Sequence, residues 1–440
     1  MNKQITQATN LMRQHPFYAV VSIVGTAVTV AFIMVVVMIY DFRTADIDPE
    51  SDRSHLMYTG KGRTARRDNT NVSSGMGRVA WEALFEGLPG VEDATWYAAL
   101  DKSVCSLPAS SERHNLLVRS VAANWFTFFR YDFVAGRPFT QAEYDMGRSA
   151  YRESASEFHK MEAVDNPGLR SVVITEHVAR LLFGSAAEAV GKVFWIDFHP
   201  STVVGVVRDV SSIFQTAYAD AFRPFTLYNE DKAQYWTGGL GGVRLGVLKL
   251  SGGTRPDDVR AEVARRETLL NDRGLEYTFR MEQLYTHTDY TFFRDTTVDA
   301  RLVYVLLIVV LLVVPAVSIS GLMNAQTQGR LSEIAVRKAY GASNFSILCR
   351  FVGEGLVSTL IGGVAGYALS CLLVWAGRVW LFGSGGTDLS GISLSGSLLF
   401  RPALFVAVLC VCFVFNLLSV LLPAWLAVRR PIAPTLKGES

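Results

Sequence analysis

The sequence predicts an α-helical membrane protein with four transmembrane helices and a large mixed α+β extracytoplasmic domain, inserted between the first and second helices. Half of the 440 residues are hydrophobic and the mean hydropathy is +0.24, which is unusual for a soluble chain of this length. The charged fraction of 19% is nevertheless too high for a chain that lies wholly in lipid. Together these values indicate apolar spans combined with a water-exposed domain.

Four segments are long and apolar enough to cross a bilayer core, which takes roughly 20 residues of helix. Each contains a long run without Lys, Arg, Asp or Glu, and the predicted spans are 17–40, 301–324, 354–381 and 402–426. The first span is too long for the apolar part of a signal peptide, and no cleavage site of small residues follows it. We therefore expect it to be an uncleaved anchor.

Lys and Arg in the short flanking segments predict the orientation, because cytoplasmic flanks are enriched in both. Three segments carry them, and these are the N-terminal segment 1–16, the segment 325–353 and the tail 427–440. The loop 382–401 has neither residue from position 383 to position 400. We expect both termini and the segment 325–353 to be cytoplasmic, with the domain 41–300 and the loop 382–401 outside.

The domain 41–300 combines helical and strand patterns. The expected helices are 73–88, 176–184 and 256–270, and the expected strands are 91–100, 171–175, 193–197, 202–210, 243–250 and 275–281. This order suggests two βαβ-like units, or one split lobe with an insertion. Residues 193–197 and 202–210 are expected to form a β-hairpin. Residues 141–170 are polar and poorly patterned, and we interpret them as a long loop or a variable insertion. Cys105 is the domain's only cysteine, so a hydrophobic core must stabilise the domain without an internal disulfide.

The residues of this domain do not form a pattern typical of catalysis or of metal binding. Its histidines lack the HExxH spacing, and no GxSxG elbow occurs. Asp46, Asp48, Glu50 and Asp52 alternate as in a calcium loop, but Ser51 stands where an EF-hand needs glycine. We therefore predict no catalytic residue, no metal ligand and no cofactor bound by this chain. The sequence also lacks a basic patch interleaved with aromatic residues, which argues against a nucleic-acid partner.

Two further patterns concern the membrane part of the chain. In the segment 325–353, Ser332 precedes a short predicted helix that Gly341 ends, although arginines in such a segment can serve topology alone. In the third span, small residues recur every four positions, at Ser358, Gly362, Gly366 and Ser370. Small residues at this spacing let another helix approach closely. The stripe therefore packs either against the fourth span of the same chain or in a dimer seam.

The segment 333–343, EIAVRKAYGAS, resembles the E-I-x-x-R-K-A-x-G-A-S signature of the FtsX-like permease family, which comprises ABC-transporter membrane subunits of the MacB and LolC/LolE type. Glu354, Gly362, Gly363 and Gly366 resemble this family's pattern in the third span. The chain's C-terminal PAWLAVRRPIAPTL also fits, except that Thr435 stands where alanine is usual. In the outer domain, the motifs similar to a MacB-like periplasmic core domain are 124–129, 135–139, 190–192 and 204–209. The resemblance covers nearly the whole chain.

The resemblance implies that the cytoplasmic segment is a coupling helix that docks on a cassette ATPase. The residues expected to carry this contact are Glu333, Ile334, Arg337, Lys338, Gly341, Ala342 and Ser343. The sequence contains no GxxxxGK[ST] motif, so ATP and magnesium are expected on a separate ATPase subunit and not on this chain. The second span, with a weakened helix at Pro315, would carry the motion outward. The apolar runs inside the predicted spans lack Lys, Arg, Asp and Glu, whereas an ion-coupled transporter needs ionisable residues inside the membrane.

Three functions are consistent with these features. The first is a MacB- or LolC/LolE-type permease that transmits ATP-driven motion to the outer domain for export or membrane extraction. The second is an FtsX-like mechanotransmitter that regulates a cell-envelope hydrolase, although the outer domain is larger than FtsX needs. The third is a membrane-anchored sensor or enzyme.

For the first function, the expected location is the bacterial inner membrane, with a periplasmic domain. The expected partners are the ATPase, an identical or paralogous permease in a homodimer or heterodimer, a periplasmic adaptor, an outer-membrane channel and membrane lipids. The substrate stays open among macrolides, peptides, lipoproteins and lipids.

Overall fold

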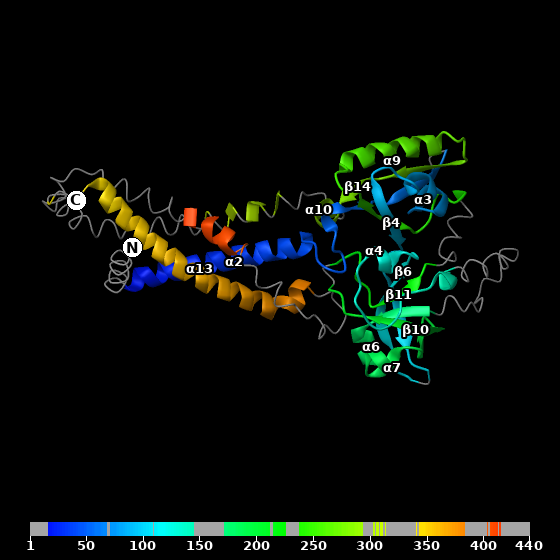
Figure 1. The fold of residues 1–440 in the computed structure, drawn as a ribbon, viewed down its shortest axis with the longest axis horizontal. Coiled ribbons are helices and arrows are strands. Elements are labelled where there is room, and N and C mark those ends of the chain that lie inside the picture. The colour runs from blue at the N-terminus through cyan, green and yellow to red at the C-terminus, as the bar shows by residue number, and fades with distance from the viewer. Residues whose placement is uncertain are drawn as a thin grey trace. The chain divides into compact units, whose positions relative to one another are not determined.

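The computed structural model describes most of the outer domain and two long membrane helices (Figure 1). The described residues are 16–67, 71–108, 110–144, 171–211, 214–225, 237–293, 340 and 343–382, together with parts of 302–313 and 403–414. The chain divides into two compact units. The membrane unit comprises 1–42, 298–381 and 393–440, and the outer domain comprises 43–297 and 382–392.

The membrane unit contains helix α2 (Pro16–Thr44) and helix α13 (Asn344–Phe382). Within them, Ile23–Thr44 and Thr359–Gly377 are long and apolar enough to cross a membrane. The described residues of the second and fourth predicted spans are helical. Two candidate spanning helices are thus seen in the described part of the chain, and the count of four stays a prediction. Helix α13 begins ten residues before the predicted span, because the helix continues into the flanking segment 344–353.

The outer domain is built on one large mixed β-sheet. Its strands are β1 (Leu56–Thr59), β4 (Val91–Tyr97), β5 (Asp101–Ser106), β6 (His114–Val121), β7 (Phe133–Gly136), β8 (Ser171–Thr175), β9 (Val193–Ile196), β10 (His199–Val207), β11 (Ala221–Pro224), β12 (Leu245–Leu250) and β14 (Leu284–Thr286). The strand order is β11-β8-β10-β9-β5-β6-β4-β12-β1-β14, and β7 pairs with β10. Strand β11 also pairs with β6, so the first six strands of this order close into a ring.

Helices cover the two ends of this sheet (Figure 1). At one end, α3 (Arg78–Phe85) and α9 (Pro256–Asn271) pack with a small antiparallel sheet of β13 (Tyr277–Met281), β2 (Gly62–Arg66) and β3 (Asn71–Ser74). At the other end, α6 (Glu176–Phe183) and α7 (Ala186–Ala189) pack on the ring of strands. We call these two ends the α9 lobe and the ring lobe.

An aromatic core lies between the two lobes. Strand β4 of the α9 lobe meets β6 of the ring lobe at the register pair Tyr97↔Val121. Around this point, buried Trp125, Phe129 and Phe222 pack with the tyrosines of the sheet. Buried aromatic pairs contribute about 0.5–1.5 kcal/mol each beyond the area that they bury. The aromatic core therefore connects the lobes where backbone pairing is short.

Several sequence predictions for this domain are confirmed. Strand 171–175 and the helix after it form as expected, and Gly184 ends that helix at a φ of +86°. Residues 193–196 and 199–207 form the predicted antiparallel hairpin. Parallel pairing of β8 with β10 around α6 gives the first βαβ-like unit. Cys105 is a buried free thiol, so the domain's stability does come from its core.

Other details of the prediction were wrong. The helix expected at 73–88 begins at Arg78, because Ser73 and Ser74 belong to β3 and Gly77 precedes the helix in extended geometry. The second βαβ-like unit does not form, since β12 lies in the large sheet while β13 pairs with β2 in the small one. Local periodicity predicted each strand, but it did not identify the pairing partner. Most of the polar segment 141–170 lies outside the described residues.

Candidate functional site

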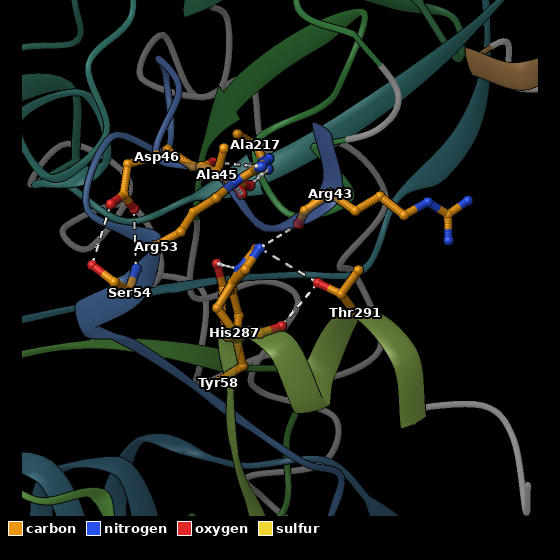
Figure 2. Close-up of polar contacts among 10 residues, drawn as sticks. Arg43, Ala45, Asp46, Arg53, Ser54, Tyr58, Ala217, His287 and Thr291 are labelled. Carbon is orange, nitrogen blue, oxygen red and sulfur yellow. Dashed lines mark hydrogen bonds and ion pairs between the residues drawn. The ribbon is translucent and has the colours of Figure 1, made fainter. Parts of the chain in front are cut away.

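The site begins where helix α2 ends in the outer domain (Figure 2). His287 is the first residue of α10 (His287–Phe293), the helix that precedes the second predicted span in the chain. Its Nε2 lies 2.9 Å from the carbonyl oxygen of Arg43, in the last turn of α2. One side chain thus joins the segments that lead to the first and second spans.

The partners of His287 fix its tautomer. A carbonyl oxygen only accepts hydrogen bonds, so Nε2 carries the hydrogen that is donated to Arg43. Nδ1 then accepts a hydrogen bond from the hydroxyl of Tyr58 at 3.0 Å. The residue is 7% exposed, and burial is the main cause that lowers the pKa of His287. The charge of Arg53 acts in the same direction, while that of Glu50 opposes it. The ring is therefore neutral at neutral pH, as this tautomer requires.

Tyr58 connects this contact to the large sheet. It lies on β1, is 1% exposed, and its ring stacks on Tyr290 with 4.3 Å between centroids. The hydroxyl groups of Tyr290 and Tyr97 are 2.9 Å apart. Burial raises the pKa of Tyr58 well above its usual value, so its hydroxyl stays protonated and can donate to His287. A displacement at the end of α2 therefore acts directly on strands of the α9 lobe.

A buried ion pair makes a second attachment just after α2. Arg53 Nε and Glu50 Oε2 are 3.0 Å apart, and the two side chains are 1% and 2% exposed. Arg53 also donates to the carbonyl of Ala45 at 3.0 Å, and its guanidinium lies 4.4 Å from the centre of the Phe214 ring. Glu50 Oε1 accepts from the backbone N–H of Ala217 at 3.1 Å. The pair thus binds the segment after α2 to a turn far away in the sequence.

Residues of the ring lobe bind this turn, 214–218, through hydrogen bonds. Arg119 on β6 is 2% exposed and donates to the carbonyl of Tyr218. The hydroxyl of Tyr131 donates to the carbonyl of Ala217 at 2.6 Å. The end of α2 is therefore attached to the α9 lobe through His287 and to the ring lobe through the ion pair. We call this set the stem joint, and it comprises residues 43–54, Tyr58, turn 214–218 and His287.

Three of the four alternating acidic residues of the sequence, Asp46, Glu50 and Asp52, take part in this joint. Asp46 accepts hydrogen bonds from the backbone N–H and the hydroxyl of Ser54, at 3.1 and 3.3 Å. Asp52 lies 2.9 Å from the ammonium group of Lys249. Together with Glu50, these carboxylates each bind a different group of the protein. Within the described residues, no cluster of three His, Cys, Asp or Glu side chains is placed to hold a metal ion.

A further buried carboxylate stands at the start of the predicted insertion. Glu143 is 6% exposed and lies 3.0 Å from Arg137, 2.6 Å from the N–H of Thr140 and 2.7 Å from the hydroxyl of Ser171. Burial raises the pKa of Glu143, but hydrogen bonds from these groups outweigh it and bring the value to about 2. Because Ser171 follows the segment 145–170, Glu143 holds the two ends of that segment together.

The predicted ATPase-coupling residues are mostly outside the described residues, namely Glu333, Ile334, Arg337, Lys338, Gly341 and Ala342. Ser343 is described and lies directly before α13. Its Oγ accepts a hydrogen bond from the backbone N–H of Ser346 at 3.2 Å, and its carbonyl oxygen accepts one from the backbone N–H of Ile347 at 3.3 Å. Ser343 is thus the N-cap of α13. Its contact with an ATPase stays a prediction.

The small residues of the third span lie against the first span. A Cβ added to Gly362 would be 2.9 Å from the carbonyl oxygen of Ile23, and one added to Gly366 would be 2.5 Å from that of Ala27. Ser370 is fully buried and donates to a carbonyl of its own helix. The sequence suggested the fourth span or a dimer seam as the partner of this stripe. In the described residues Gly362 and Gly366 face α2, while the neighbouring Gly363 lies against Leu409 of the fourth predicted span. The dimer seam stays a prediction. The side chain of Ser358 lies outside the described residues.

Sequence reasoning did not identify the stem joint. His287 was considered only for metal or catalytic spacing, and Glu50 only as part of a calcium loop. The one available signal was position, because both residues lie within about fifteen residues of a predicted span. Ionisable groups so close to a membrane helix are candidates for contacts between the helix and the domain that follows it.

Two family models together match most of the chain. Residues 19–266 match the MacB-like periplasmic core domain, and residues 305–432 match the FtsX-like permease C-terminal domain. The chain therefore belongs to the MacB/FtsX-like family of ABC transporter permeases. The family resemblance of the sequence motifs is confirmed, as is a membrane permease with a MacB-like mixed α/β outer domain.

Curated relatives are similar at low identity. The macrolide export ATP-binding/permease protein MacB of Bordetella avium is 29% identical over 219 residues, which cover 50% of this chain and 32% of the relative. The MacB of Salmonella paratyphi A is 25% identical over 238 residues, covering 53% and 35%. The uncharacterized ABC transporter permease YknZ of Bacillus subtilis is 26% identical over 206 residues, covering 46% and 48%. The chain thus matches about a third of each MacB relative and about half of YknZ.

Solved structures of extracytoplasmic domains are similar to about half of the chain. The periplasmic region of MacB from Actinobacillus actinomycetemcomitans has 14% identity and a TM-score of 0.34, covering 56% of this chain and 95% of that one. The extracellular domain of YknZ from Gram-positive bacteria has 16% identity and a TM-score of 0.33, covering 51% and 100%.

Proposed function

We propose that this chain is the permease subunit of a MacB- or LolC/LolE-type ABC transporter. A separate cytoplasmic ATPase binds ATP and magnesium, and its movement reaches the permease at the coupling segment. The permease transmits that movement to the outer domain, which exports a substrate or extracts it from the membrane. The ATPases of such transporters act in pairs, so the working unit is a permease dimer, formed by identical or paralogous chains.

The stem joint is the observation that carries this proposal. An anchor would need only a flexible linker between its membrane helix and its domain. Here the end of α2 is bonded within a few residues to both lobes, through His287 and through the Glu50–Arg53 pair. Buried, fully bonded polar groups make a stiff attachment, since opening them leaves unsatisfied groups. A stiff attachment at both lobes is what transmission of rigid-body movement requires.

Co-purification with candidate cassette ATPases tests the proposal. The wild-type chain is expected to retain an ATPase, and the double substitution Glu333→Ala with Arg337→Ala is expected to abolish retention. Arg350→Ala serves as the matched control, because it removes an arginine of the same segment from outside the signature. Absence of any association, or association that the double substitution leaves unchanged, would count against the proposal.

The family match also bears on the choice between export and regulation. A MacB-like periplasmic core domain over 19–266 favours export or extraction over regulation of an envelope hydrolase. A pull-down from envelope extracts with the full chain separates the two. Recovery of a periplasmic adaptor is expected, and stable recovery of a cell-wall hydrolase would favour the FtsX-like role. A membrane-anchored enzyme would give neither partner.

A further inference from the structure

The small sheet of the α9 lobe has one buried face and one open face. Thr64 on β2 and Phe279 on β13 are opposite each other and fully buried, and Phe279 belongs to the same core as the apolar residues of α9. Neighbouring residues of a strand point to opposite faces. Arg63 and Arg280, the next opposite pair, therefore stand on the open face, where both are exposed. We call this open face the arginine face, and it comprises Arg63, Ala65, Thr278 and Arg280.

Two like charges are opposite each other on the arginine face. Residues directly opposite in an antiparallel pair have Cβ atoms about 4.5–5.5 Å apart, and like charges placed so destabilise a sheet. Among the residues that the structure describes, Arg280 forms no ion pair with a carboxylate. Arg63 lies 3.9 Å from Glu282, but these side chains are 63% and 43% exposed, so water screens the pair. The sheet thus keeps two arginines side by side with little neutralisation.

The segment around β2 adds further positive charge. Residues 61–67 include no acidic residue and four basic ones, namely Lys61, Arg63, Arg66 and Arg67. Arg66 pairs with Glu276 at 2.8 Å. Arg67 donates to two backbone carbonyls, which leave its positive charge uncompensated. Lys61 forms no ion pair with any described residue. An anion that approaches the arginine face therefore meets a net positive field.

The surface beside the two arginines is low. Ala65 and Thr278 form the next opposite pair on the same face, and the hydroxyl of Thr278 donates to the carbonyl of Ala65 at 3.3 Å. These small side chains leave room for an acceptor group to reach the guanidinium groups from the side. Arginine presents a planar fork of donors that matches a carboxylate, which it binds with two parallel hydrogen bonds.

Two glutamates limit the length of an anionic partner. Glu276 and Glu282 flank β13 at its two ends and are 60% and 43% exposed. They are six positions apart, which is roughly 20 Å of extended chain. A broad anionic surface such as a bilayer would meet both carboxylates as well as the arginines. A short acidic segment of about six extended residues can lie between them.

We propose that the arginine face is a docking surface for a short acidic segment of another polypeptide, with a carboxylate held between Arg63 and Arg280. The bound carboxylate accepts from both guanidinium groups and removes their mutual repulsion. Lys61 and Arg67 attract the segment and raise the rate of encounter. The proposal goes beyond the permease function, since it concerns a partner of the outer domain and needs no ATPase.

A labelled acidic peptide tests the proposal on the full chain in neutral nanodiscs. The probe is a capped hexapeptide of alternating Glu and Ser, and the control peptide has Gln in place of Glu. Fluorescence anisotropy at low salt should show several-fold tighter binding of the Glu peptide. Arg63→Gln and Arg280→Gln should each weaken it by up to about fivefold, the upper range for exposed charge pairs. Arg208→Gln is the matched control, because it removes an arginine that is 66% exposed from the ring lobe.

Hydrogen exchange separates lost binding from lost structure. In the free chain, Arg280→Gln should leave β13 at least as protected as in the wild type, because the substitution removes a like-charge pair. If β13 is less protected, the affinity of Arg63→Gln decides. Equal binding of the two peptides, or unchanged affinity in the arginine variants, would overturn the proposal. Equal weakening by Arg208→Gln would also overturn it, since net charge would then explain the attraction. So would Arg63-dependent binding to phosphatidylglycerol vesicles without binding of the Glu peptide, which would assign the face to a membrane.

Discussion

Arg53→Met is expected to loosen the stem joint by opening its buried ion pair. The substitution keeps an apolar side chain of similar length over Phe214, so it removes mainly the charge and the hydrogen bonds. Glu50 is then left 2% exposed, with the N–H of Ala217 as its remaining partner shown by the structure. A buried charge that loses its partner destabilises its surroundings by about 3–5 kcal/mol.

The double substitution Glu50→Gln with Arg53→Met measures how much the intact ion pair contributes to stability. Replacing both charges of a buried pair by neutral groups is often nearly neutral, because the desolvation penalty disappears with the attraction. We therefore expect the double variant to lie within about 1–2 kcal/mol of the wild type. In a double-mutant cycle, the interaction energy between the two substitutions should therefore be large, as it is for groups in direct contact.

Hydrogen exchange at the amide of Ala217 measures both effects in the full chain. For Arg53→Met, protection should fall by a factor of roughly a hundred to a few thousand, since about 1.4 kcal/mol corresponds to tenfold. Lys249→Met is the control, because its pair with Asp52 is partly exposed and contributes less than about 1 kcal/mol. Unchanged protection in Arg53→Met, or a double variant as open as the single one, would refute the reasoning.

Three further predictions concern other groups of the outer domain. Burial lowers the pKa of His287 in the folded chain, so its contribution to stability is present above about pH 6.5 and is lost as the pH falls. Hydrogen exchange at the stem joint should therefore rise in acid. The variant His287→Gln should show a smaller rise. The pKa of Glu143 is likewise lowered, to about 2, so Glu143→Gln should remove stability above pH 4.5 that the wild type loses only in stronger acid. Thermal unfolding at neutral pH should show that Glu143→Gln lowers the free energy of unfolding by at most about 3 kcal/mol, and by less where solvent screens the half-exposed Arg137. An unchanged free energy of unfolding would contradict the lowered pKa of Glu143. Gly184→Ala should cost about 1–2 kcal/mol at its φ of +86°, whereas Gly252→Ala, with an open Cβ position and ordinary φ, should leave the melting temperature nearly unchanged.

The parts of the fold that the sequence predicted depend on local patterns. The hairpin of β9 and β10, the helix that ends at Gly184 and the helix that begins at Pro256 each follow from periodicity and punctuation within a few residues. The pairing of β13 with β2 is different, because the paired residues lie more than 200 positions apart. Nothing in either strand identifies its partner.

The stem joint was missed for the same physical reason. His287 is 244 positions from Arg43, and Glu50 is 167 positions from Ala217. In a local window, such a residue resembles any polar group of a loop. The glycine contact could be predicted in part, since the four-residue spacing shows that some helix approaches. The identity of that helix depends on the packing of the whole membrane unit.

The closed ring of strands has a consequence for the time at which the outer domain can fold. The ring closes through β6 and β11, whose contacts, such as Ser120 with Arg223, join residues 103 positions apart. Until residue 224 has crossed the membrane, β6 lacks this partner and presents an open edge. Such long-range pairing is slow, so this lobe is expected to be the last part to assemble and the part most exposed to misfolding during translocation. The intervening segment 141–170 adds little to this delay, because the entropy of closing a loop grows only with the logarithm of its length.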